Sequence, residues 1–132
     1  MESQLKMQAE GMPYVFFIGF QNQSKMPIVY RLGDILCLPS KGPGETWGLS
    51  VNEAMAAGLP VLVSDKVGCA VDLVLSEETG YVFQSTSLAD LKNILKQLDK
   101  NQLRAMGTKA NKHISTWNFD NQVHAIINQL NG

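Results

Sequence analysis

Four short runs of the chain are continuously apolar rather than alternating between apolar and polar residues. Runs of this kind, bounded by turn residues, are typical of strands buried on both faces of a parallel sheet. The segments between and after them instead repeat their apolar residues at helical spacing. This alternation predicts an α/β fold, with helices on both faces of a parallel sheet. The predicted strands are residues 15–18, 35–38, 61–63 and 81–83.

Helix start and stop residues mark the segments between these strands. Ser24 and Pro27 predict a helix start between the first two strands, and Gly33 predicts its end. Gly58 and Pro60 predict the end of the helix before the third strand, because glycine adopts a left-handed conformation there and proline cannot continue the helix. A helix-like segment leads into the first strand. Three amphipathic helices are predicted after the last strand, over residues 88–98, 103–114 and 123–130.

Length and composition fit one domain. With 132 residues, 45% of them apolar, the chain can form one core but not two ordinary domains, so residues 1–132 are taken as one unit. A formal net charge of −1 gives no general attraction to nucleic acid, which is excluded as a partner. No apolar run reaches the roughly 18 residues of a membrane-spanning helix, and no signal peptide is recognised. Cys37 and Cys69 lack a CxxC spacing, so a cytoplasmic protein with reduced thiols is expected.

The chemistry that stands out lies in residues 39–65, PSKGPGETWGLSVNEAMAAGLPVLVSD. A glycine-rich loop here connects a predicted strand to a helix. Open parallel sheets bind anions at such places, because free backbone amides and the helix dipole face the ligand. The spacing of the glycines fits neither the dinucleotide GxGxxG motif nor the P-loop. A different phosphate-bearing ligand is therefore predicted, and Lys41 could contact its phosphate or remain solvated.

Two glutamates flank this loop and indicate other groups of the ligand. A carboxylate accepts hydrogen bonds from two neighbouring hydroxyls, such as the diol of a ribose or a hexose. Glu45 and Glu53 would lie ~12 Å apart if the segment between them were helical throughout. The acid and base of a glycoside hydrolase lie only roughly 5 to 9.5 Å apart. The pair therefore favours a ligand with two diols over glycoside hydrolysis.

Glu53 also has a purely structural interpretation. Ser50 and Glu53 match a capping box, in which the serine caps a helix and the glutamate returns the hydrogen bond. The helix would then run only over residues 51–57, shorter than the average of about 11 residues, whereas a start near Trp47 gives a normal length. The chemistry of the residues leaves both interpretations open.

The same stretch resembles the Glu-x7-Glu region of the retaining glycosyltransferases of the GT-B fold, family four. The pattern of that family reads approximately PS-x-x-E-x-F/W-G-L-x-x-x-E-A-M-A-x-G-x-P-V-V. The resemblance continues upstream through FFIGF and LGDILCLPS, and downstream through GCAVDLV, TGYVF and the terminal helices. It implies the C-terminal half of a GT-B fold, a three-layer Rossmann-like donor-binding domain truncated at its N-terminal side. The acceptor-binding domain, and the early loop whose Arg and Lys bind the diphosphate, are absent from this sequence.

The resemblance also implies roles for individual residues. Glu53 would hold the ribose hydroxyls, and Glu45, as the catalytic candidate, would contact hydroxyls of the transferred sugar. Phe20 and Gln21 would lie near the base. Backbone amides at the helix start would face the sugar and stabilise charge on the departing diphosphate, so that no metal or cofactor is needed. These amides are those of Thr46, Trp47, Gly48 and Leu49.

For the complete enzyme, the resemblance implies sugar transfer from a nucleotide-diphosphate sugar with retention of configuration. It implies synthesis of a cell-surface polysaccharide or glycolipid, in the cytoplasm or with peripheral attachment to the inner face of the membrane. The isolated chain is expected to be inactive and to self-associate through apolar surfaces that the missing domain would cover. A non-catalytic α/β nucleotide-binding or regulatory domain is the alternative. A receiver-like signalling domain fits less well, because Asp34 and Asp65 do not form its acidic cluster.

Overall fold

Three parallel strands form the sheet in the structure, a computed structural model that describes residues 2–42 and 46–130. They lie side by side in chain order, and Leu62 of the middle strand is in register with Cys37 and Tyr81 of its neighbours. The carboxyl ends of all three strands therefore meet at one edge, and the predicted parallel α/β fold is confirmed. The strands are β1 (Leu36–Leu38), β2 (Val61–Ser64) and β3 (Gly80–Phe83).

The middle strand is covered on both faces, which explains its continuously apolar run. All four residues of β2 are buried, and successive side chains of a strand point to opposite faces. One face packs against helix α3 (Leu49–Ala56) in the main hydrophobic core. The residues of β2 and α3 in this core are Val61, Val63, Val51, Ala54 and Met55.

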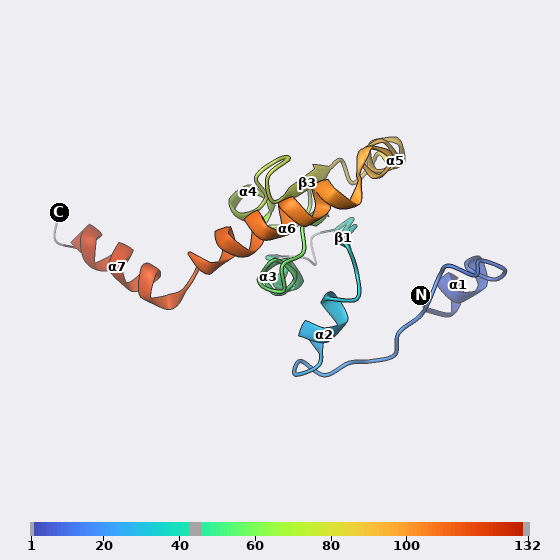
Figure 1. The fold of residues 1–132 in the computed structure, drawn as a ribbon, viewed down its shortest axis with the longest axis horizontal. Coiled ribbons are helices and arrows are strands. Elements are labelled where there is room, and N and C mark those ends of the chain that lie inside the picture. Colours follow the sequence, from blue (N-terminus) through green and yellow to red (C-terminus); the bar gives the residue numbers. More distant parts are fainter. Residues whose placement is uncertain (1, 43–45, 131–132) are drawn as a thin grey trace.

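The other helices extend the molecule on either side of the sheet, with α1 and α7 at opposite ends (Figure 1). Helix α2 packs against α3, α6 crosses α3, and α5 contacts β3. The three helices predicted after the last strand are confirmed, whereas the short α4 was not predicted. No helix of the described residues is both long and apolar enough to span a bilayer. The bounds are α1 (Glu2–Gln8), α2 (Met26–Tyr30), α4 (Ala70–Leu73), α5 (Leu88–Gln97), α6 (Lys100–Ser115) and α7 (Phe119–Leu130).

The end of α3 confirms the predicted stop at Gly58. This residue has a φ of +85°, in the left-handed region that glycine adopts easily. The N–H of Gly58 donates to the carbonyl of Met55 at 3.0 Å, and the N–H of Leu59 donates to the carbonyl of Ala54 at 2.9 Å. This pair of bonds is a Schellman motif, which ends the helix and directs the chain into β2.

The strand predicted at residues 15–18 is wrong. The segment between α1 and α2 has no regular secondary structure, and it runs well away from the sheet (Figure 1). A strand forms only where a neighbouring strand supplies backbone hydrogen-bond partners, and among the described residues the sheet contains only β1, β2 and β3. The apolar side chains of this run are exposed instead, Phe16 by 81% and Ile18 by 61%.

The crossing of α6 over α3 brings two backbones into close contact at Gly107. A Cβ at this position would overlap the carbonyl oxygen of Gly58. We expect Gly107→Ala to lower the free energy of unfolding by about 1–3 kcal/mol through overpacking, although alanine is the better helix former. Urea unfolding followed by circular dichroism measures the change. Lys112→Ala, at an exposed position of α6, is the control, and its free energy of unfolding should stay within about 0.5 kcal/mol of that of the unmodified chain. A Gly107→Ala variant of unchanged stability would contradict the close contact.

Candidate functional site

The N-terminus of α3 follows the carboxyl end of β1 along the chain. Gly48 is its N-cap and has a φ of +97°, and a Cβ there would also press on the Val67 side chain. Glycine therefore satisfies both the backbone conformation and the space available. Since Gly48 has no side chain, no side-chain cap accepts a hydrogen bond from the first amides of α3.

A second backbone segment fixes the residues that lead into α3. The N–H of Cys69 donates to the carbonyl of Trp47 at 2.9 Å. Gly68 packs so closely that a Cβ would overlap the carbonyl of Thr46. The next position does accommodate a side chain, because that of Cys69 is buried, with its Sγ 3.9 Å from the carbonyl of Gly48.

The capping-box interpretation of Glu53 is wrong. The helix begins at Leu49, one residue before Ser50, so Ser50 is not its N-cap. The helix also begins two residues after the predicted start near Trp47. Residues 46–48 are not helical, so the ~12 Å separation estimated for a continuous helix does not apply.

Glu53 instead connects α3 to α2. Its Oε2 accepts a hydrogen bond from the Tyr30 hydroxyl at 2.8 Å, and its Oε1 accepts one from the Gln23 side-chain amide at 3.4 Å. Tyr30 is only 8% exposed. Its burial, together with the hydrogen bond and negative charge of Glu53, raises the pKa of Tyr30 to about 12. The phenol therefore remains a proton donor to the carboxylate throughout the physiological range.

These three side chains border an open cavity of about 370 Å³ between α2 and α3. Its walls are mainly apolar, and Gln23, Tyr30, Arg31 and Glu53 supply polar groups. Such a combination of apolar walls and a few placed polar groups is typical of small-molecule sites. The other lining residues are Met26, Pro27, Arg31, Ala56 and Ala57.

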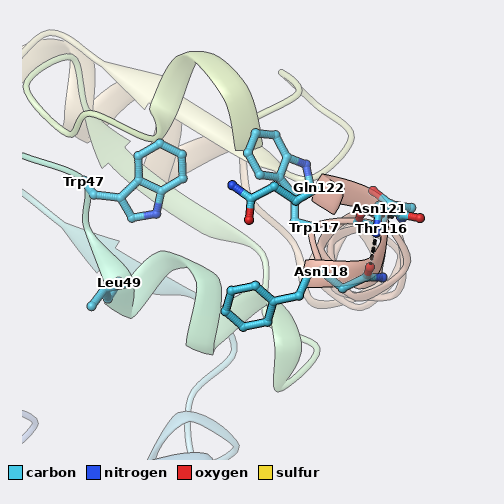
Figure 2. A pocket seen from close by; sticks show the side chains of 8 residues that line it. Trp47, Leu49, Thr116, Trp117, Asn118, Asn121 and Gln122 are labelled. Atoms are coloured by element: carbon cyan, nitrogen blue, oxygen red, sulfur yellow. Dashed lines mark hydrogen bonds between the residues drawn. The ribbon is translucent and has the colours of Figure 1, made fainter. Parts of the chain in front are cut away.

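A second cavity, of about 630 Å³, lies between the start of α3 and the junction of α6 with α7 (Figure 2). Trp47 and Leu49 form one side of it, and the residues of the junction form the other. The rings of Trp47 and Trp117 are tilted by 48°, with centroids 6.1 Å apart. The indole N–H of Trp47 donates to Asn52 Oδ1 at 2.9 Å, so Trp47 both packs on the core and forms a cavity wall.

The structure brings together only part of the site that the sequence predicts. The residues at the start of α3 and Glu53 lie on one helix, about one turn apart. Phe20 is 96% exposed, and the Gln21 side chain donates to the carbonyl of Gly19 at 3.1 Å. Their segment reaches the cavity through Gln23. The residues placed at or just before the start of α3 are Thr46, Trp47, Gly48 and Leu49.

The structure does not place two of the predicted residues in this site. Glu45, the catalytic candidate, lies outside the described residues. Lys41 borders a different cavity, beside the end of β3 and the start of α5. No group of three His, Cys, Asp or Glu side chains that could hold a metal ion occurs within residues 2–42 and 46–130. The expectation of metal-free donor binding stays a prediction.

Sequence reasoning missed Tyr30 and Gln23. A signal for Tyr30 was present, because it follows Met26 by four residues on the apolar face of α2 and a buried tyrosine hydroxyl requires a hydrogen-bond partner. The identity of that partner could not be read from the pattern, since Glu53 lies 23 residues further along the chain.

Comparisons with known proteins agree with this arrangement. The family model described as "Glycosyl transferases group 1" matches residues 1–114. The D-inositol 3-phosphate glycosyltransferase of Gordonia bronchialis is 31% identical over 115 residues, which are 86% of this chain and 24% of that protein. The phosphatidyl-myo-inositol mannosyltransferase of Mycobacterium leprae is 32% identical over 103 residues, 77% of this chain and 27% of that protein. The chain thus spans about a quarter of the length of these relatives.

Two solved structures superpose on nearly all of the chain. Sucrose-phosphate synthase of Thermosynechococcus elongatus matches with a TM-score of 0.79 and 25% identity, over 98% of this chain and 33% of that chain. Anabaena Alr3699/HepE, solved in complex with UDP, matches with a TM-score of 0.78 and 25% identity, over 97% of this chain and 36% of that chain. The irregular segment before α2 is therefore included in superpositions on proteins about three times as long.

The contact between Tyr30 and Glu53 can be tested without a ligand. We expect Glu53→Gln to lower the pKa of Tyr30 from about 12, because the variant removes the negative charge that opposes ionisation. The pKa should remain above the usual value of about 10, since burial is the largest cause of the shift and persists. Titration of the 13C-labelled Tyr30 ring by NMR measures it. Asp65→Asn is the control and should leave the pKa of Tyr30 unchanged. If Tyr30 has the same pKa in the Glu53→Gln variant as in the unmodified chain, the contact is contradicted.

Proposed function

The chain belongs to the glycosyl transferases group 1, a family of GT-B glycosyltransferases, and on this premise we propose that it binds the nucleotide-diphosphate sugar donor. The observation that carries the proposal is the position of Glu53, whose carboxylate faces a cavity about one turn from the uncapped N-terminus of α3. A diol and a diphosphate of one ligand can then engage one helix. The carboxylate accepts from the ribose hydroxyls, while the amides of residues 46–49 donate to the diphosphate.

We take uridine diphosphate as the donor nucleotide to test first. Alr3699/HepE, which is 25% identical to this chain, has been solved with UDP and with UDP-glucose. The chain offers apolar cavity walls beside Glu53 for a base, and Phe20 and Gln21 lie in the segment that leads to this cavity. The proposal places the base between that segment and α2.

The transfer step belongs to the complete enzyme in this proposal. Amides at the start of α3 stabilise the charge that develops on the departing diphosphate, without a metal ion, and Glu45 contacts the transferred sugar. The configuration of the sugar is retained. The product is a cell-surface polysaccharide or glycolipid, made in the cytoplasm or by an enzyme peripherally attached to the inner face of the membrane. The name of one relative, the phosphatidyl-myo-inositol mannosyltransferase, contains a phospholipid and supports the glycolipid alternative.

The acceptor-binding domain is a further partner in this proposal. Exposed apolar residues on the segment before α2 and on α7 are surfaces that such a domain could cover. Self-association of the isolated chain through the same residues stays a prediction, open to sedimentation at increasing concentration. These residues include Phe16, Ile18 and Phe20, and on α7 Phe119, Ile126 and Leu130.

Donor binding is tested by titrating UDP, GDP and ADP into the chain, followed by NMR or calorimetry. We expect Glu53→Gln to weaken binding of the preferred nucleotide by about fivefold or more, because a hydrogen bond to a carboxylate is worth about 1 kcal/mol more than one to a neutral amide. Glu78→Gln, at an exposed position away from the cavity, is the matched control. Replacing EDTA with magnesium chloride should change the affinity of the unmodified chain for the nucleotide by less than twofold.

Two results of this titration would contradict the proposal. Equal nucleotide affinity in the Glu53→Gln variant would favour the non-catalytic domain, in which Glu53 only joins α2 to α3. A strict requirement for magnesium would contradict the metal-free site.

The isolated chain should not transfer or hydrolyse a donor sugar, because this proposal places the acceptor site outside it. Incubated with UDP-glucose, it should release no more UDP than buffer alone, as measured by a coupled assay for UDP. The Glu53→Gln variant is the control for any trace of contaminating enzyme. Release of UDP that the unmodified chain catalyses and this variant does not would overturn the prediction.

A further inference from the structure

We propose that Tyr30 is a positioning residue, which orients the Glu53 carboxylate so that both of its oxygens can accept from a vicinal diol of the donor nucleotide. This inference rests on the proposed function of the same site. The established family activity does not assign a role to Tyr30, and the resemblance in the sequence does not include it.

Tyr30 is a rigid hydrogen-bond donor. It is the last residue of α2, its ring belongs to the main hydrophobic core, and only 8% of it is exposed. The hydroxyl at the end of this fixed ring donates to Glu53 Oε2 at 2.8 Å. Gln23, in contrast, is exposed and lies at 3.4 Å from Oε1, so its bond is the weaker of the two. Tyr30 therefore determines the orientation of the carboxylate.

The Glu53 carboxylate keeps acceptor positions that remain available to a ligand. An ionised carboxylate has about four acceptor positions, two on each oxygen. Tyr30 takes one position on Oε2, and Gln23 takes one on Oε1. One position is left on each oxygen, at the border of the cavity between α2 and α3. Two neighbouring hydroxyls can donate to these two positions at once.

Loss of this orientation would weaken the binding of a diol. A glutamate side chain that becomes ordered on binding loses rotamer entropy, and this loss opposes binding. Tyr30 holds the Glu53 side chain in place before the ligand arrives, so binding of a diol does not require this loss of rotamer entropy. A ligand without the diol gains nothing from the orientation. Comparing a ligand that has the diol with one that lacks it therefore tests the role of Tyr30.

The test compares the affinities of UDP and 2′,3′-dideoxy-UDP for the unmodified chain and for Tyr30→Phe. We expect the unmodified chain to prefer UDP by about tenfold or more, since two hydrogen bonds to a carboxylate distinguish the ligands. In the Tyr30→Phe variant, the ratio of the affinity for UDP to that for the dideoxy ligand should fall to a third or less of its value in the unmodified chain. The fall should come from weaker binding of UDP. Its affinity for the dideoxy ligand should stay within twofold. Tyr81→Phe, on β3, is the matched control and should keep the full preference.

Each other outcome has a defined meaning. A full preference for UDP in Tyr30→Phe overturns the role of Tyr30 and leaves the proposed donor site standing. Equal weakening of both ligands also overturns it, because Tyr30 then acts on the fold rather than on the carboxylate. An unmodified chain without any preference for UDP shows instead that the proposed ribose contact of Glu53 is wrong, and this inference fails with it.

A measurement on the unmodified chain covers the case in which Tyr30→Phe does not fold. The 13Cζ resonance of Tyr30 should shift when UDP binds, because the diol shares the carboxylate with the phenol. The same resonance should shift much less with the dideoxy ligand at equal saturation. Equal shifts with the two ligands would overturn the proposal.

Discussion

Close backbone packing at both ends of α3 is the constraint on which the candidate site depends. At its start, Gly48 leaves no room for a side chain beside Val67, and Gly68 packs directly on the carbonyl of Thr46. At its end, Gly107 of α6 contacts the carbonyl of Gly58 in the same way. A helix held at both ends by backbone contacts keeps its position more precisely than one held by flexible side chains alone. The first amides of α3 and the carboxylate of Glu53 thereby keep a fixed relation to each other.

The sequence predicted those parts of the fold that depend on local patterns. Continuously apolar runs indicated β1, β2 and β3, and Gly58 indicated the end of α3, because the relevant interactions lie within a few residues. The run at residues 15–18 has the same local pattern, but a strand also needs a neighbour, and a pattern does not show whether the chain provides one. The start of α3 was misplaced for a similar reason. The left-handed conformation of Gly48 depends on contacts with residues about 20 positions away.

The candidate site was predictable to the extent that it follows the family pattern. Glu53 and the loop before it match that pattern, and the comparisons place the chain in the same family. Tyr30 was not predicted as part of the site, because its bond with Glu53 joins two helices that are separate in the sequence. A buried tyrosine requires a partner for its hydroxyl, but only the packing of α2 against α3 identifies that partner. Contacts between elements are therefore where the structure adds most to the sequence.

The choice of a phenol as the partner of Glu53 has an electrostatic consequence. Among the described residues, the ion pairs found do not include Glu53, although Arg31 borders the same cavity. A guanidinium would take two acceptor positions and neutralise the charge, whereas the neutral hydroxyl of Tyr30 takes one position and leaves the charge in place. The charged carboxylate strengthens hydrogen bonds from a diol and repels a diphosphate. The N-terminus of α3 attracts the diphosphate instead. The N-terminus of α3 and the carboxylate about one turn further along the helix therefore favour different parts of a nucleotide-diphosphate sugar, which gives the donor one orientation in the proposed site.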